Sequence, residues 1–412
     1  MEGMAVWITL VFAATFTGVA FVGLLVVRRT LEPLFALLTL GSLASSAWAF
    51  GTLAQNYERL DALFFAFAFA VAGSAGGYAL ASTLLWRLAL RERIASFPSA
   101  PPADNGTAAV VVLGIVEPTL YDERWTASSL IALAEEELLD ASIVILPFLF
   151  LAAKARYRAA GGSSPGVRQL ETLSERLGMA LPVDRIGRVW SAATDGTHSL
   201  DHVVAAAVAA GHRTIVVAQA LIAGSHELDE AKRRVGSLRL ASQGVTVAYT
   251  DGLWGSERVA SLVTAKALAV AHDVSTTGVL LVGVGQPEPR SRTYRSFDER
   301  ENAFLSRARM LLIERGVPGN SVRLAWSEWR IPDVTSGVRH LDALGCSHLV
   351  VVPACFPLDS IATLLDLPMA TRQARVEDSV SVVTLNAWGD DTGVVAELRE
   401  QTLTLLDESR LH

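Results

Sequence analysis

A histidine followed by two carboxylates is the clearest candidate for metal chemistry in this sequence. His226, Glu227 and Asp229 come just after an apolar run that ends at Ala220, where a strand should give way to a helix. A neutral imidazole with nearby carboxylates can bind Co²⁺, Ni²⁺, Fe²⁺ or Zn²⁺. The alternative is structural, because Ser225 would cap this helix and the acidic residues would favour its N-terminus. Both interpretations stay open at this point.

Further candidates follow apolar runs nearer the C-terminus. Asp359 comes after a proline-bounded turn, and we expect it to face His226 across a cleft. Glu328 and Trp329 directly follow another run. They would line a pocket that accepts a flat ring, or else be a surface Glu beside a buried Trp. We predict catalytic roles for His226, Asp359 and Glu328.

An arginine-rich stretch and two turn glutamates complete the candidates. Arg292 and Tyr294 lie in the stretch Arg-Ser-Arg-Thr-Tyr-Arg. Its guanidinium groups could meet carboxylates of a ligand or anionic lipid headgroups, or the stretch could be a solvated loop. Glu117 and Glu288 belong to two similar turns and would be exposed unless they line the same cleft.

The elements that must position these residues follow an unusually apolar N-terminal quarter. Only 11 of the 35 basic and 42 acidic residues lie in the first 100 positions. Three runs without a charge cover residues 4–27, 34–53 and 62–86. Each has about the 20 residues that a helix needs to cross ~30 Å of hydrocarbon. Residues 1–95 are therefore predicted to be a transmembrane domain of three helices.

The arginines beside these runs predict their orientation in a cell membrane. Arg28 and Arg29 follow the first run and three arginines follow the third, whereas the second link holds one arginine beside two acidic residues. The positive-inside rule then places the N-terminus outside and the soluble region in the cytoplasm. Small residues in the second and third runs predict close helix packing, within this chain or against a partner membrane subunit.

Charge and motif content argue against several classes of partner. Beyond residue 100 the chain has 29 basic and 37 acidic residues (35 − 6 and 42 − 5), which does not suit a nucleic-acid partner. Cys346 and Cys355 lack zinc-site spacing and are expected to be buried thiols. Gly283-Val284-Gly285 has Glu288 where a dinucleotide fingerprint needs its third Gly, so no nucleotide is predicted.

Past a predicted linker at 96–107, short apolar runs alternate with amphipathic ones. The strands expected from these runs are 108–114, 142–147, 214–220, 245–250, 278–284, 322–326, 348–353 and 379–385. The expected helices are 128–139, 164–177, 199–210, 227–243, 256–272, 297–315, 335–344 and 391–408. This alternation predicts an α/β fold with a parallel sheet covered by helices on both faces.

The soluble region is predicted to be a duplicated unit. Val112–Pro118 lines up with Leu281–Pro287 at an offset of 169 residues (283 − 114), and Gly211–Val217 matches Gly345–Val351 at an offset of 134 (345 − 211). We therefore expect halves at 108–275 and 276–412. The first should hold 35 extra residues (169 − 134), around 153–164. Ligands of such sheets bind outside the carboxyl ends of the strands, so a cleft between the halves is expected.

At these residues the chain resembles the tetrapyrrole metal chelatases, which include ferrochelatase and the sirohydrochlorin and cobalt chelatases. Val110–Pro118 is similar to the ferrochelatase opening strand with its Leu-Gly-Thr-Pro turn, and Gly161–Pro165 to its Gly-Gly-Ser-Pro loop. Glu328–Pro332 resembles Glu-Trp-Leu-x-Pro, and Val352–Leu364 resembles a Pro-x-x-Phe-x-x-Asp-x-x-Glu-Thr-Leu run. Ala220–His226 resembles the apolar-Gly-x-His stretch of the sirohydrochlorin type.

The resemblance covers residue 108 to the C-terminus and implies two flavodoxin-like halves. It also implies insertion of a divalent metal substrate, Fe or Co, into a porphyrin-type or sirohydrochlorin-type ring. His226, with Glu227 and Asp229, would then hold the metal. The side chains expected to contact the tetrapyrrole are Trp329, Arg292 and Tyr294.

Two departures from the family pattern favour a different outcome. Val284 stands where ferrochelatase has its histidine, and Ala362 stands where the family has its glutamate. Neither side chain can take a pyrrole proton or bind a metal. The alternative is a catalytically inactive chelatase-like module that binds a tetrapyrrole or serves as a subunit of a membrane complex.

Overall fold

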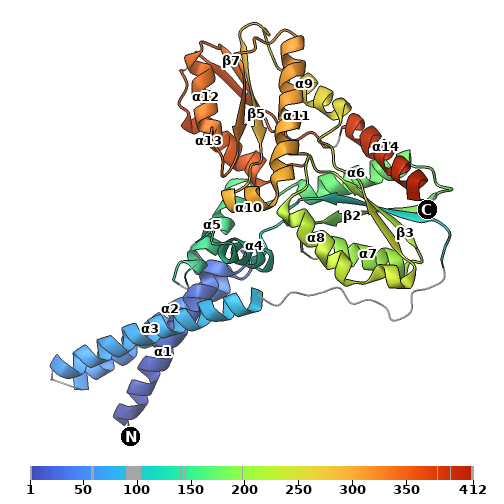
Figure 1. The fold of residues 1–412 in the computed structure, drawn as a ribbon. Coiled ribbons are helices and arrows are strands. Elements are labelled where there is room, and N and C mark those ends of the chain that lie inside the picture. The colour runs from blue at the N-terminus through green and yellow to red at the C-terminus, as the bar shows by residue number, and fades with distance from the viewer. Residues whose placement is uncertain are drawn as a thin grey trace. The chain divides into compact units, whose positions relative to one another are not determined.

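A computed structural model describes residues 2–56, 60–89, 104–139, 142, 144–196, 198–377, 379–389 and 391–409. The chain forms two compact units (Figure 1). The first, called the helical unit here, combines Met1–Arg93 with Leu120–Gly162. The second, called the sheet unit, combines Ile94–Thr119 with Ser163–His412. Most of the linker predicted at 96–107 lies outside the described residues.

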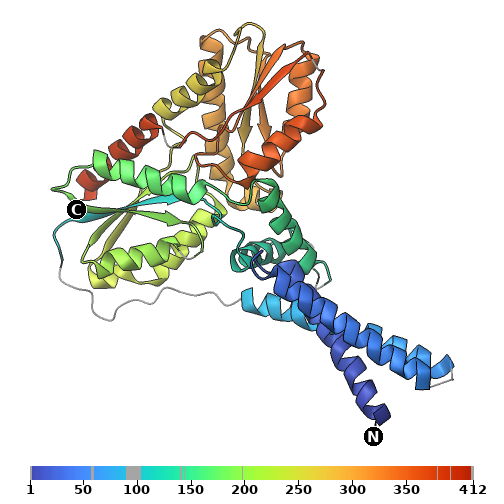
Figure 2. The ribbon, with the colours of Figure 1, turned by 180° about the vertical axis from the view of Figure 1, so that it is seen from behind.

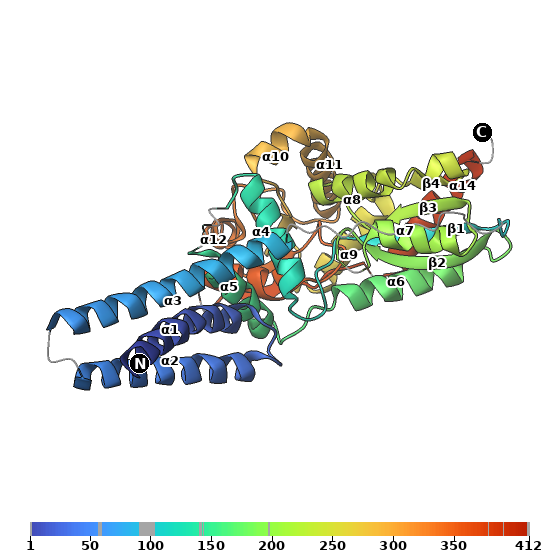
Figure 3. The same ribbon diagram turned by 90° about the horizontal axis from the view of Figure 1, so that it is seen from below.

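Three long helices form most of the helical unit: α1 (Glu2–Val26), α2 (Glu32–Asn56) and α3 (Leu60–Ala89). Each contains a stretch long and apolar enough to cross a membrane. They lie side by side, and α1 packs against both others (Figure 3). Gly18 of α1 and Gly77 of α3 let these two helices approach closely, because a Cβ on either glycine would collide with backbone atoms of the other helix.

The helical unit also takes in a segment that follows the first strand of the sheet unit. This segment forms α4 (Glu123–Glu135) and α5 (Leu146–Ala159). The strand predicted at 142–147 is wrong, since Val144 and Ile145 lie in a turn and Pro147 occupies the first turn of α5, where proline is tolerated. The predicted helix at 128–139 begins earlier, because the Asp122 side chain accepts hydrogen bonds from backbone N–H groups of α4.

The sheet unit contains two four-stranded parallel sheets, as predicted. In the first, β1 (Ala108–Gly114), β2 (Ile186–Ala193), β3 (Thr214–Gln219) and β4 (Thr246–Tyr249) have the order β2-β1-β3-β4. In the second, β5 (Thr277–Gly283), β6 (Val322–Trp326), β7 (His348–Val352) and β8 (Ser381–Thr384) have the order β6-β5-β7-β8. These are two flavodoxin-like halves with the same topology.

The predicted duplication is confirmed by strand positions. β5 begins 169 residues after β1 (277 − 108), and β7 begins 134 residues after β3 (348 − 214). The difference arises between β1 and β3 of the first half, where Leu120–Gly162 leaves the sheet unit. This segment lies mostly before the 153–164 region in which extra residues were expected.

Helices cover both faces of both sheets. The helices of the sheet unit are α6 (Gly166–Ala180), α7 (Leu200–Ala209), α8 (His226–Ser237), α9 (Glu257–Ala269), α10 (Glu288–Thr293), α11 (Arg295–Glu314), α12 (Val334–Ala343), α13 (Leu367–Gln373) and α14 (Thr392–Ser409), with short helical turns at Leu240–Gln243 and Ala362–Asp366. One face of the first sheet packs on α7 and α8, and one face of the second packs on α12 and α13. The remaining faces share a single core with α6, α9, α11 and α14.

The two halves exchange helices across this shared core. The C-terminal helix α14 packs against α6 and β3 of the first half (Figure 2). In return, α9, which follows β4, packs against α11 and β7 of the second half. Separating the halves would therefore expose buried side chains of both, so the sheet unit is one folding body rather than two independent domains.

Candidate functional site

The candidate site consists of the loops that follow four central strands. In each sheet the strand order reverses between the first and third strand of the half, that is, at β1 and β3 and at β5 and β7. Open parallel sheets bind ligands beside this reversal, at the carboxyl ends of the strands. We therefore locate the predicted residues in the segments that follow these strands and β6.

The loop after β1 is hydrogen-bonded to the segment after β7. The Glu117 carboxylate accepts a bond of 2.5 Å from the backbone N–H of Ile361. Gln169, in α6, donates to the Asp359 carboxylate at 2.9 Å and accepts from the Asp359 backbone N–H at 2.7 Å. Glu117 is thus a residue that joins the two halves, rather than an exposed turn carboxylate.

Asp359 has a well-defined structural environment. Its side chain is buried, and its two carboxylate oxygens accept hydrogen bonds from Gln169, from the Thr363 hydroxyl at 3.0 Å and from the Ala387 backbone N–H at 2.8 Å. A buried carboxylate is stabilised by such donors. These bonds show how Asp359 holds α6 against the second half, and they occupy oxygens that a metal would otherwise take.

The loop after β3 contacts the segment after β5. The Nδ1 atom of His226 lies 3.2 Å from the Tyr294 hydroxyl, and the two rings meet edge to face. Next to them, Arg290 donates to the Glu227 carboxylate at 2.9 Å. Because β5 and β7 repeat β1 and β3, the two contacts between the halves are related by the duplication: β1 meets β7, and β3 meets β5.

His226 is the first residue of α8, and the capping interpretation of its neighbour is confirmed. The Ser225 hydroxyl accepts a hydrogen bond from the backbone N–H of Leu228 at 3.2 Å. Glu227 is paired with Arg290, and Asp229 is exposed. Over the described part of the chain, no three His, Cys, Asp or Glu side chains are grouped so that they could hold a metal. The structure therefore does not assemble His226, Glu227 and Asp229 into a ligand set.

The other predicted ligand-contact residues surround this second contact. Tyr294 is half-buried between α10 and α11. Arg292 is exposed and pairs with Glu288 one helical turn earlier, with an N···O distance of 2.5 Å. Such an exposed pair is weak and easily exchanged for another anion. Glu288 is therefore an exposed residue, as one of the two interpretations of the sequence predicted.

Glu328 and Trp329 form the loop that follows β6. Both are exposed, with 51% of Trp329 accessible, which excludes the alternative of a buried Trp. The backbone of Trp329 has φ of 62°, a left-handed conformation that is costly for a bulky side chain. Flanking bonds hold it there, since Ser327 N–H donates to Gly283 O and Arg330 N–H donates to Glu328 O. The indole is thus presented at the carboxyl ends of β5 and β6.

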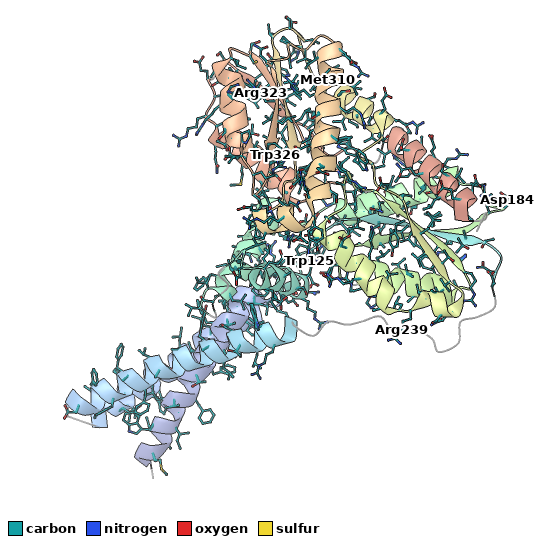
Figure 4. All side chains as sticks on the ribbon, in the orientation of Figure 1. Trp125, Asp184, Arg239, Met310, Arg323 and Trp326 are labelled. Atoms are coloured by element: carbon teal, nitrogen blue, oxygen red, sulfur yellow. The ribbon has the colours of Figure 1, made fainter. Side chains whose placement is uncertain are left out.

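A buried glutamate below this loop was missed from the sequence. Glu301, in α11, is 1% exposed, and it accepts hydrogen bonds from Val284 N–H at 2.7 Å and from the indole N–H of Trp326 at 3.2 Å. Trp326, at the end of β6, is labelled in Figure 4. Burial raises the pKa of Glu301, although these bonds partly oppose the shift. The available signal was its position between Phe297 and Phe304 on the apolar face of a long amphipathic helix.

The thiol of Cys355 lies beside the same carboxylate. Cys355 is buried, as predicted, and burial together with the negative charge of Glu301 raises the pKa of this thiol well above its usual value. On the outer side of Trp326, the Arg330 guanidinium stacks 4.3 Å from the ring centre and reaches the Asp298 carboxylate at 3.3 Å. The groups close to the turn after β5 are therefore the Glu301 carboxyl, the Cys355 thiol and the Trp326 ring.

Comparison with known proteins gives matches among solved structures alone. No family model matches the sequence, and none of the curated proteins matches it. The chain is similar to SirB from Bacillus subtilis with Fe³⁺, at 13% identity and a TM-score of 0.47, over 74% of this chain and 97% of that one. It is similar to CbiX, the terminal enzyme for biosynthesis of siroheme in denitrifying bacteria, at 14% identity and a TM-score of 0.43, over 72% and 98%. A third similar structure is a multi-domain Deinococcus radiodurans protein with structural similarity to chelatases, at 16% identity and a TM-score of 0.40, over 73% and 54%.

Proposed function

We propose that this protein is a membrane-anchored tetrapyrrole chelatase that inserts Fe or Co where the loops after β3, β5 and β6 come together. The observation that carries the proposal is the contact of His226 with Tyr294 across the two halves. It supports a role for this imidazole, because His226 follows β3 and open sheets bind ligands beyond the carboxyl ends of their strands. The ordered motifs that resemble the chelatases along the sequence support the same assignment.

His226 can supply the chemistry that metal insertion requires. Insertion exchanges two pyrrole N–H protons for one divalent cation, so a group is needed that accepts protons and binds metal. When Nδ1 of His226 donates to the Tyr294 hydroxyl, Nε2 is the ring nitrogen that carries the lone pair. In either tautomer, the Tyr294 hydroxyl can orient the imidazole through Nδ1, because a phenol both donates and accepts hydrogen bonds.

The neighbouring exposed residues suit a flat, acidic ring. The half-exposed indole of Trp329 offers an aromatic face for stacking on a macrocycle. Arg292 can exchange its exposed partner Glu288 for a carboxylate of the ligand. In this proposal Glu328, which is exposed beside Trp329, receives a proton released from the ring.

The three apolar helices support anchoring in a bilayer. Their apolar stretches cover Met4–Val26, Glu32–Gln55 and Asp61–Arg87. We propose that they span a cell membrane with the N-terminus outside and the sheet unit in the cytoplasm. A tetrapyrrole with an apolar ring could then pass directly between the protein and the lipid.

A second candidate function is tetrapyrrole binding without metal insertion. Val284 and Ala362 favour it, because they replace the histidine and the glutamate of the family that the sequence resembles. The hydrogen bonds of Asp359 also favour binding without metal insertion, since both of its carboxylate oxygens already accept hydrogen bonds. Such a module would hold a tetrapyrrole, or act as a subunit of a membrane complex.

A binding titration tests what the two candidates share. Purified full-length protein in lipid nanodiscs is titrated with sirohydrochlorin or protoporphyrin IX, and the Soret band and the tryptophan fluorescence are recorded. We expect saturable binding that Trp329→Ala weakens about fivefold, since stacking on an aromatic ring contributes roughly 1 kcal/mol. The matched control is Trp190→Ala, on strand β2, which should bind like wild type. Equal binding by the Trp329 variant, or no saturable binding at all, contradicts the proposal.

A further inference from the structure

We propose that the turn between α4 and α5 is a second membrane contact, which inserts Val144, Ile145 and Phe148 into the apolar part of the bilayer. The partner is the lipid itself, at the same end of the helices as Arg28 and Arg87. The inference rests on the proposed membrane anchoring and goes beyond it. The segment Leu120–Gly162, called the insertion here, interrupts the first half of the sheet unit. In this proposal the insertion is part of the membrane-bound surface.

The insertion is bound to the helical unit by polar contacts at the end of α1. The buried amine of Lys154 donates to Leu24 O at 2.9 Å and pairs with Glu32 at 3.0 Å. Its charge also meets the negative end of the α1 dipole. The Tyr121 hydroxyl donates to Val26 O at 2.7 Å. These bonds fix the C-terminal half of α5 at the level where the α1 span ends.

Arg28 adds a salt bridge at the other end of the insertion. Its guanidinium contacts Asp122 at 2.5 Å and Glu123 at 2.8 Å, just at the start of α4. The pKa of Arg28 is raised mainly by its hydrogen bond to Glu123. Both helices of the insertion are therefore attached to the short link between α1 and α2.

The turn itself lies deeper along the apolar helices. The Tyr78 hydroxyl donates to Val144 O at 2.6 Å, and Tyr78 precedes Arg87 by nine residues (87 − 78). At ~1.5 Å per residue, that places Val144 about 13 Å further into the apolar stretch of α3 than Arg87. Ile145 also precedes Lys154 by nine residues of chain (154 − 145), so it lies at the end of α5 away from that buried amine.

The surface of the turn suits lipid rather than water. Val144, Ile145 and Phe148 are 66%, 42% and 48% exposed. Val144 also lines a mostly apolar cavity of about 680 Å³ with residues of all three long helices, among them Phe21, Leu43 and Val71. Ile145 and Leu146 donate their backbone N–H groups to Ser142 O, and Tyr78 satisfies Val144 O. Backbone groups that meet hydrocarbon must be satisfied in this way.

The insertion is closed where it leaves the sheet unit. Ser164 N–H donates to Thr119 O at 2.8 Å, so the residues just before and just after the insertion lie next to each other. The sheet unit is thus joined to the helical unit through the insertion as well as through the segment that precedes β1.

Depth-dependent fluorescence quenching tests this inference on the full chain. Phe148→Cys is labelled with an environment-sensitive fluorophore, reconstituted in phosphatidylcholine vesicles, and exposed to lipid-attached nitroxides or to aqueous iodide. Leu43→Cys, at a 50% exposed position of α2, is the membrane control, and Val183→Cys, at an 85% exposed position of the sheet unit, is the water control. Because the native cysteines are buried, labelling occurs at the introduced position.

We expect nitroxide quenching at position 148 within about twofold of that at position 43, and about fivefold above that at position 183. Quenching of position 148 by iodide, as at position 183, overturns the inference while the membrane anchor stands. Protection from both quenchers also overturns it, because a protein partner or second copy would then cover the turn. Failure of nitroxides to quench position 43 overturns the membrane anchor itself.

Discussion

The carboxylate of Glu301 accepts a hydrogen bond from the backbone N–H of Val284 at 2.7 Å, so a buried acid of α11 holds the turn after β5. Val284 is the position at which the resembled family has its histidine. This strand end therefore has no imidazole at position 284, but it has an ionisable group behind the backbone. Because this acid is 1% exposed, its proton affects the stability of the turn rather than a ligand directly.

Glu301→Gln should destabilise the sheet unit by about 1–3 kcal/mol, because the new amide places a donor against the indole N–H of Trp326. Burial raises the folded-state pKa of Glu301 above 4.5, so the folded protein keeps a proton that the unfolded chain has released. Wild-type stability from this group is therefore lost as the pH rises from about 4.5 through the folded-state pKa. The deficit of the variant should shrink over that interval.

Thermal unfolding of both proteins in detergent, followed by tryptophan fluorescence at several pH values, measures this difference. Glu299→Gln is the matched control, since Glu299 lies in the same helix and pairs with Arg295 at the surface. It should change stability by less than about 0.5 kcal/mol. If the loss of stability caused by Glu301→Gln grows with pH, the folded-state pKa of Glu301 is lowered rather than raised.

Tyr294→Phe should slow metal insertion about tenfold while tetrapyrrole binding changes little. The substitution keeps the ring contact with His226 but removes the hydroxyl that orients its Nδ1. Initial rates from the visible spectrum, with Kd from a titration, separate the two effects. Tyr249→Phe, in strand β4, is the control and should leave both unchanged. An equal loss of binding would instead make Tyr294 a ligand contact.

Lys154→Met should loosen the insertion from the helical unit. The substitution preserves the length of the side chain but removes the donor to Leu24 O and the charge opposite Glu32. Losing one partner of a buried ion pair costs roughly 3–5 kcal/mol. Limited proteolysis should then cut between Leu120 and Gly162 faster than in wild type. The control is Arg158→Met, whose exposed side chain also pairs with Glu32; cleavage at the wild-type rate in both variants would contradict the role of Lys154.

The orientation in the membrane rests on the arginines beside the apolar runs. Tyr57→Cys, between the second and third runs, should react with an impermeant maleimide added to intact cells. Ala100→Cys, after the third run, should react only once the membrane is opened. The opposite labelling pattern would place the sheet unit outside and remove the positive-inside argument.

Strands buried on both faces were predictable, because continuous runs such as Val110–Leu113 and Leu349–Val352 leave little choice of structure. β2 was missed because it is an edge strand, in which Gly187 and Arg188 are exposed and interrupt the apolar pattern. The opposite error occurred at 142–147, where a strand was predicted and none is present. A short apolar run fits a strand as well as it fits a turn that leads into a helix. Contacts with α1 and α3 decide that segment, and a local pattern contains no information about them.

The candidate site divides in the same way. His226 and Asp359 could be selected as candidates because both follow predicted strands. Their partners, Tyr294 and Gln169, are 68 and 190 residues away, so no spacing rule could have identified these pairs. For Glu301, the apolar face of the helix gave a signal of burial, but its partners Val284 and Trp326 could not be identified from that pattern.

Metal insertion by the purified full-length protein tests the central claim most directly. Protein in nanodiscs is mixed anaerobically with sirohydrochlorin or protoporphyrin IX and with Co²⁺ or Fe²⁺, and the shift of the Soret band is followed against a protein-free control. The account predicts insertion by wild type and a loss of at least about 100-fold in His226→Ala, with tetrapyrrole binding and thermal stability retained. Saturable tetrapyrrole binding with insertion no faster than the protein-free control, or insertion unaffected by His226→Ala, would contradict it.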